Sequence, residues 1–86
     1  MRVLTQLGSV YAEPAAGRSP DYAKARQLWE IASAANDPVA MCFLGLLHEN
    51  GLGVAADKKT ALRWYERSKT TGGCPAVDES IARVRQ

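Results

Sequence analysis

Apolar residues recur at helical spacing along most of the chain, in segments separated by glycine and proline. Residues 2–12 carry an apolar stripe made of Leu4, Leu7, Val10 and Tyr11, whose successive members are three, three and one positions apart. Similar stripes follow in segments 20–35, 38–50, 57–69 and 75–85. No stretch alternates with the two-residue period of a strand over a useful length. The pattern therefore predicts an all-α chain, a single domain over residues 1–86 with five helices joined by short loops.

Residues typical of helix ends lie between these apolar segments. Ser19-Pro20-Asp21 and Asp37-Pro38 each offer a capping side chain and a proline for the first turn. Asp57 is the predicted start of the fourth helix, with Ala55 or Ala56 as the alternative cap, and Pro75 opens the fifth. The predicted breaks contain glycine or proline and lie at Pro14–Gly17, Asn50–Gly53 and Thr70–Gly73.

The chain also repeats itself. An offset of 36 residues relates four pairs of positions, namely Asp21 and Asp57, Ala25 and Ala61, Leu28 and Trp64, and Trp29 and Tyr65. Leu7-Gly8 and Leu44-Gly45 are 37 apart, and Ala40 and Ala76 are again 36 apart. Such a constant offset is typical of a solenoid. It divides the chain into repeat 1 (about 3–37), repeat 2 (about 38–73) and a C-terminal capping helix (about 75–85).

Small residues inside the predicted helices suggest close packing. Glycine in a helix costs about 1 kcal/mol relative to alanine, so Gly8 and Gly45 are explained if another helix backbone crosses there. The bulky aromatic residues are then expected to fill the core around each crossing; they are Tyr11, Trp29, Trp64 and Tyr65.

The segment LGLLHENGLGVAADKKTALRWY, residues 44–65, resembles the Sel-one-like repeat, a relative of the tetratricopeptide repeat. The matching positions are Leu44-Gly45, Gly51, Gly53-Val54, Asp57, Ala61 and Trp64-Tyr65, whereas His48 stands where the family has an aromatic residue. The first copy is degenerate, with residues 13–17 in place of the Gly-x-Gly-Val loop. The resemblance implies a right-handed α-solenoid of antiparallel helix pairs, in which the first helix of each pair lines the concave face.

Composition and charge exclude several classes of partner. A net charge of +2 is too small to indicate nucleic acid or an anionic membrane. The basic stripe Lys59, Arg63 and Arg67 is interpreted as a solvated convex face. The N-terminal segment lacks the uninterrupted apolar core of a signal peptide, and no run is long enough to span a membrane. A soluble cytoplasmic protein is the expectation.

The two cysteines, Cys42 and Cys74, lack the close spacing of a metal or redox motif. They are predicted to be free thiols in a reducing cytoplasm, with a single bridge in an exported protein as the alternative. A cysteine-rich branch of the resembled family bridges its helices with disulfides. Because Cys42 and Cys74 do not repeat in register, free thiols remain the prediction.

No catalytic constellation can be assembled from the sequence. His48 is the only histidine, and it is interpreted as half-buried in the place of the family's tyrosine. Gly51-Leu52-Gly53 lacks the lysine and the preceding strand of a phosphate-binding loop. We therefore expect no enzyme, no metal and no cofactor; an enzyme acting on cell-wall or β-lactam compounds is the least favoured hypothesis.

One group of residues is a candidate binding surface. On the third helix Cys42, Phe43, Leu46 and Glu49 point away from the helix stripe and, in a solenoid, toward the concave face. Equivalent positions include Gln6 and Ser9 in the first helix and Glu79 in the fifth. Phe43 and Leu46 with polar neighbours resemble a small protein-binding hot spot. The alternative is that both residues simply pack against the first and fifth helices.

These features predict a protein–protein interaction module, a scaffold or adaptor that binds a protein or peptide on its concave face. The alternative is a small immunity-type inhibitor of a cognate bacterial enzyme. Solenoids usually need three or more repeats with polar caps. Helix five is polar enough for a cap and helix one is less protected, so we expect self-association through helix one or a longer repeat array.

Overall fold

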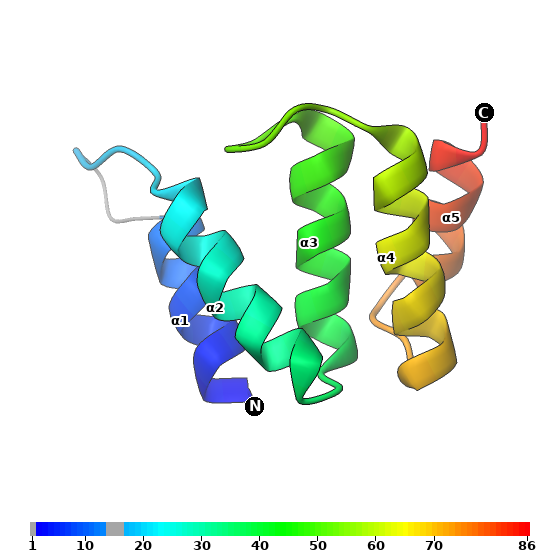
Figure 1. Ribbon diagram of the computed structural model, residues 1–86, viewed down its shortest axis with the longest axis horizontal. Helices are drawn as coiled ribbons and strands as arrows, with labels where there is room; N and C mark the ends of the chain where they lie inside the picture. Colours follow the sequence, from blue (N-terminus) through cyan, green and yellow to red (C-terminus); the bar gives the residue numbers. More distant parts are fainter. Residues whose placement is uncertain (1, 14–16) are drawn as a thin grey trace.

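The computed structural model describes residues 2–13 and 17–86, which form five α-helices and no strand. The helices are α1 (Arg2–Ala12), α2 (Tyr22–Ala34), α3 (Pro38–Asn50), α4 (Lys58–Thr71) and α5 (Val77–Val84). They lie side by side in chain order, each antiparallel to the one before (Figure 1). The predicted all-α, solenoid-type fold is thereby confirmed. The predicted break at Pro14, Ala15 and Ala16 lies outside the described residues.

Aspartate caps the starts of three helices. Asp37 accepts a hydrogen bond from the Val39 backbone N–H at 3.0 Å, with Pro38 in the first turn of α3 as expected. Asp57 caps α4 by accepting from the backbone N–H groups of Lys59 and Thr60 and from the Thr60 hydroxyl. The hydrogen bonds from Thr60 are the main reason that the pKa of Asp57 lies below its usual value.

Two helix starts differ from the prediction. Asp21, rather than Ser19, caps α2 by accepting from the Lys24 N–H at 3.0 Å. The Asp21 N–H donates to the Tyr11 carbonyl at 2.8 Å, which ties this residue to the end of α1 and delays the helix to Tyr22. Helix α5 begins at Val77 rather than Pro75 because Ala76 adopts a left-handed conformation, with φ of 63°.

Each helix pair is built around a glycine that faces an aromatic ring. A Cβ atom at Gly8 would lie 2.4 Å from Trp29 Nε1, and one at Gly45 would lie 2.6 Å from Tyr65 Cε1. The atoms nearest to each glycine thus belong to an aromatic ring of the second helix of the pair, not to its backbone. Glycine removes the side chain that would hold the second helix of each pair away from the first.

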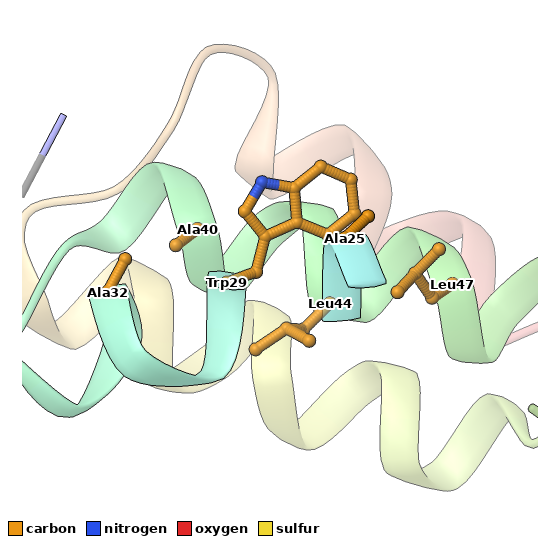
Figure 2. Packing of buried hydrophobic residues seen from close by; sticks show 6 residues of the cluster. All are labelled: Ala25, Trp29, Ala32, Ala40, Leu44 and Leu47. Carbon is orange, nitrogen blue, oxygen red and sulfur yellow. The ribbon is translucent and has the colours of Figure 1, made fainter. Parts of the chain in front are cut away.

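The core consists of two apolar clusters. The first joins α2 to α3 and is shown in Figure 2; it contains Ala25, Trp29, Ala32, Ala40, Leu44 and Leu47. The second joins α3 and α4 to α5 and contains Cys42, Ala61, Tyr65, Val77, Ile81 and Val84. Trp29 and Tyr65 are buried as predicted, whereas Trp64 and Tyr11 are half-buried and pack at the edge of the first cluster.

The register of α5 differs by one residue from the predicted repeat. The buried positions of α5 are Val77, Ile81 and Val84, and those they correspond to in α3 are Ala40, Leu44 and Leu47. These pairs are 37 residues apart, not 36. The left-handed turn at Ala76 lies before the helix and shifts the following residues by one position. As a result, the buried and exposed positions of α5 differ by one residue from those that the 36-residue offset predicts.

Candidate functional site: the Phe43 groove

Three shallow hollows meet at Phe43 on α3. One, of about 310 Å³, lies toward α1 and is lined by Thr5, Gln6, Ser9, Asp37, Val39 and Phe43. A second, of about 320 Å³, lies toward α5 and is lined by Val39, Cys42, Phe43, Leu46, Tyr65, Cys74, Pro75 and Ser80. The third, of about 130 Å³, lies toward the Leu52 loop and is lined by Ser9, Ala12, Glu13, Tyr22, Trp29, Phe43, Leu46, Leu47 and Leu52. Together we call them the Phe43 groove.

Phe43 is held in place by Trp29. Their rings stack with centroids 4.8 Å apart and an interplanar angle of 28°. The Trp29 indole N–H donates to the Thr5 carbonyl at 2.9 Å, which links this stack to α1. Phe43 is half-buried, so one face of the ring contributes to packing and the rest stays accessible in the groove. A fixed ring of this kind loses little conformational entropy on binding a ligand.

Leu46 is the more exposed apolar residue of the groove. It lies about one turn from Phe43, lines two of the three hollows and exposes 38% of its surface to solvent. Asp37 and Glu13 are the charged residues that line the hollows, and Asp37 is already engaged. Its carboxylate accepts from the Thr5 hydroxyl and from the Val39 N–H. The groove is therefore mainly apolar, with neutral polar groups and these two acidic residues around it.

A disulfide between Cys42 and Cys74 forms one edge of the groove, so the prediction of two free thiols was wrong. The bridge joins α3 to the segment that leads into α5, with Cα atoms 6.5 Å apart. Disulfides persist mainly in oxidising compartments. One ground for expecting a cytoplasmic location is therefore removed, and the location itself stays a prediction.

Glu49 connects α3 to α4 and α5 beside the groove. The Arg83 guanidinium donates to both of its carboxylate oxygens, at 2.6 and 2.9 Å, and the Tyr65 hydroxyl donates at 2.8 Å. The bidentate hydrogen bond from Arg83 holds the pKa of Glu49 below its ordinary value. Burial and the hydrogen bond to Glu49 raise the pKa of Tyr65. Glu49 is thus committed to holding helices together.

The groove gathers most, but not all, of the predicted site residues. Of these residues, the ones that line it are Gln6, Ser9, Cys42, Phe43 and Leu46. Glu49 lies beside it, paired with Arg83, and Glu79 is exposed on α5 and lines none of the three hollows. Ser80 takes the place expected for Glu79 because of the one-residue shift of α5. The buried spacing of Val77, Ile81 and Val84 was the signal in the sequence that could have revealed this shift.

Other candidate chemistry is sparse in the described part of the chain. No group of three or more histidine, cysteine, aspartate or glutamate side chains there could hold a metal ion. His48 is half-buried, as predicted. Arg67 lies over the Trp64 ring, 5.4 Å from its centroid, and the two line a small hollow with Thr60 and Arg63. Within residues 2–13 and 17–86, no helix has the length and apolar character needed to cross a membrane.

The comparisons with known proteins agree with this architecture. The family model for the Sel1 repeat matches the chain twice, at residues 4–37 and 38–70. Searches of curated proteins and of solved structures gave no match. Sel1 repeats are generally protein–protein interaction modules and are typically non-catalytic. With both matches together spanning most of its length, the chain belongs to the Sel1 repeat family.

Proposed function

We propose that the Phe43 groove binds a short segment of a partner protein, inserted as uncharged apolar side chains on either side of Phe43. The observation that carries this proposal is the convergence of three hollows on one ring that is fixed by Trp29. The chain then acts as a scaffold or adaptor, with α3 as the centre of its binding face.

The composition of the groove supports a peptide-like ligand. Interface hot spots typically combine a rigid aromatic residue with apolar neighbours, inside a rim of polar groups. Here Phe43 and Leu46 form the apolar centre, while Gln6, Ser9 and Ser80 supply neutral polar groups at the sides. Each of the two larger hollows, about 310 and 320 Å³, has room for a single large side chain.

The charge distribution restricts the partner further. Among the described residues, the Glu13 carboxylate has no hydrogen-bond or ion-pair partner, whereas the Asp37 carboxylate accepts from Thr5 of α1 and from the first turn of its own helix. A strongly acidic segment would lose hydration in the groove without gaining a partner, whereas a basic residue could pair with the Glu13 carboxylate. We therefore expect the bound segment to be neutral or weakly basic, with large apolar residues as anchors.

A displayed peptide library selected against the oxidised full chain tests the proposal. The dissociation constants of the selected peptides are then measured for wild type and for Leu46→Asp. We expect at least a tenfold loss of affinity, about 1.4 kcal/mol or more, because a carboxylate would be desolvated in the apolar centre. Far-UV circular dichroism checks that the variant keeps its helices.

Leu7→Asp is the matched control, since Leu7 on α1 is as exposed as Leu46, at 42% against 38%, but lies outside the groove. It should leave the affinity of each peptide unchanged. Equal weakening by both substitutions, or none by Leu46→Asp, would place the binding surface elsewhere.

A further inference from the structure

The N-terminal end of the helix row exposes an apolar stripe. The large apolar residues of α1 on this side are accessible over much of their surface: Val3 to 77%, Leu7 to 42% and Val10 to 61%. They follow one another at spacings of four and three residues, which puts them on one face of α1. Most of the prominently exposed large apolar side chains in the described residues therefore lie on this helix.

The repeat identifies what this stripe is built to contact. An offset of 37 residues relates Val3, Leu7 and Val10 to Ala40, Leu44 and Leu47 of α3. In α3 these positions are buried against Ala25, Trp29 and Ala32 of the preceding helix, α2. The α1 stripe has the same register, but none of the described residues covers it. Within residues 2–13 and 17–86 it is therefore a helix-packing surface exposed to solvent.

Helix α2 extends this surface. Ile31 is 55% exposed and lies three residues from the half-buried Leu28. Their equivalents in repeat 2, Arg67 and Trp64, are on the side of α4 that faces the preceding repeat, because Trp64 packs on the first core cluster. By this equivalence Leu28 and Ile31 face the same end as the α1 stripe. We call the combined set, Val3, Leu7, Val10, Leu28 and Ile31, the N-terminal end face.

At the C-terminal end of the helix row, α4 and α5 carry exposed ion pairs. Asp78 forms an ion pair with Lys69 at 2.6 Å, and Arg85 forms one with Glu66 at 3.1 Å. Both pairs are exposed and join the outer side of α5 to α4. An apolar surface gains nothing by covering these hydrated charges. Stacking of one molecule's N-terminal end on another's C-terminal end is therefore disfavoured.

We propose that the N-terminal end face binds the same face of a second copy of this chain, forming a twofold symmetric dimer. The five residues that define this face are all apolar, so the face complements a second copy of itself, although the exposed Lys24 lies one turn before Leu28 on α2. Such a self-complementary patch gives a closed C2 pair rather than a filament. Antiparallel packing of α1 against its copy brings Leu7 to the twofold axis. Val3, about four residues to one side, then lies opposite Val10 of the copy.

The size of the end face sets the expected strength. The molecule measures 34 × 26 × 18 Å, and the end of the helix row corresponds to the 26 × 18 Å section, a flat area of about 470 Å². This is below the roughly 800 Å² per partner of a standard stable interface. We therefore expect a weak dimer, with a dissociation constant on the order of micromolar to tens of micromolar.

Sedimentation velocity of the oxidised full chain from about 1 µM to about 0.5 mM tests this proposal across the expected range. Wild type should shift from monomer to dimer, with no larger species. Leu7→Glu should raise the dissociation constant at least tenfold, whereas Leu46→Glu, a matched change in the Phe43 groove, should leave it unchanged. A double variant, Val3→Lys with Val10→Lys, gives the same test without touching a core residue if Leu7→Glu fails to fold.

A cross-linking experiment tests the symmetry. Both native cysteines are bridged, so in a Leu7→Cys variant a short bis-maleimide reacts with the thiol at position 7 alone. A twofold axis at this position predicts efficient covalent dimers. Any of four results would overturn the proposal. In sedimentation these are monomer at all concentrations, oligomers beyond the dimer, or dimerisation that survives Leu7→Glu or the double variant. In the cross-linking experiment it is a dimer that fails to cross-link.

Discussion

The two ends of the helix row use the same repeat positions for opposite purposes. At the C-terminal end, α5 buries Val77, Ile81 and Val84 against α4 and turns charged residues outward. At the N-terminal end, the corresponding stripe of α1 is itself exposed. One repeat pattern thus produces a closed end and an open end.

The comparison teaches that closure of a solenoid end needs more than polar residues. Helix α5 has only eight residues and no side-chain cap, so its own propensity contributes little. It is held by the Cys42–Cys74 bridge, the apolar stripe and the bidentate pair of Arg83 with Glu49. At the N-terminal end, Trp29 joins α1 to the first core cluster through its hydrogen bond to the Thr5 carbonyl, but this end presents an apolar surface to solvent.

The largest effect on the closed end is expected from the disulfide. Cys74→Ser removes a cross-link between residues 32 apart in sequence. Loop-closure entropy for such a loop predicts a fall in the free energy of unfolding of about 3–4 kcal/mol, measured by urea denaturation. Wild type treated with dithiothreitol is the control and should behave like the variant. Insensitivity of wild type to the reductant would show that the bridge does not support this end.

The next largest fall in stability is expected from a substitution at Gly45, the glycine that faces the Tyr65 ring. Gly45→Ala places a Cβ atom 2.6 Å from a buried ring that is also fixed by its hydrogen bond to Glu49. Overpacking of 1–3 kcal/mol should outweigh the gain of about 1 kcal/mol in helix propensity. We expect a net loss of up to about 2 kcal/mol in the free energy of unfolding, measured by thermal or urea denaturation. A stabilised variant would mean that the ring can move aside.

Gly8→Ala is the same test at the open end, where the Cβ atom would lie 2.4 Å from Trp29 Nε1. Trp29 is fixed by its stack on Phe43 and its hydrogen bond to the Thr5 carbonyl. We expect a loss similar to that of Gly45→Ala. A much smaller loss would show that the α1–α2 pair adapts more readily than the α3–α4 pair.

A smaller, pH-dependent effect is expected at Glu49. Its pKa is lowered in the folded chain from the ordinary 4.5, mainly by Arg83. A lowered carboxyl pKa stabilises the folded state above the unfolded pKa, and this contribution is lost as the pH falls through the folded value. Wild type should therefore exceed Glu49→Gln in stability at pH 7, and the difference should shrink below about pH 4.5. A difference that is constant from pH 7 to pH 3 would contradict the ion pair.

The smallest effects are expected on the outer surfaces. Arg85→Ala removes an ion pair whose two side chains are 62% and 47% exposed, and such pairs contribute about 0–1 kcal/mol. Val10→Lys, at the open end, should change the stability of the dilute monomer by no more than about 0.5 kcal/mol. Thermal denaturation at low concentration measures both. A loss above about 1 kcal/mol from either would mean that these surfaces contribute to the fold of the single chain.

The sequence was sufficient for the architecture because helical periodicity, caps and a repeat offset are local signals. Phe43 and Leu46 could also be placed, since both lie on the face of α3 opposite its core stripe. The disulfide, the Arg83–Glu49 pair and the role of Ser80 were not placed correctly. Arg83 and Ser80 follow the left-handed turn at Ala76, which shifts α5 by one residue and which the alanine itself does not indicate, so that only the spacing of Val77, Ile81 and Val84 signals the shift. The disulfide joins residues 32 apart in sequence and depends on tertiary packing that no local pattern shows.

Amide hydrogen exchange of the oxidised chain at about 2 µM and about 300 µM tests the contrast between the two ends most directly. If the N-terminal end is open and the C-terminal end closed, protection in α1 and α2 should rise with concentration while protection in α5 stays the same. Protection in α1 and α2 that does not change with concentration, or a rise confined to α5, would contradict it.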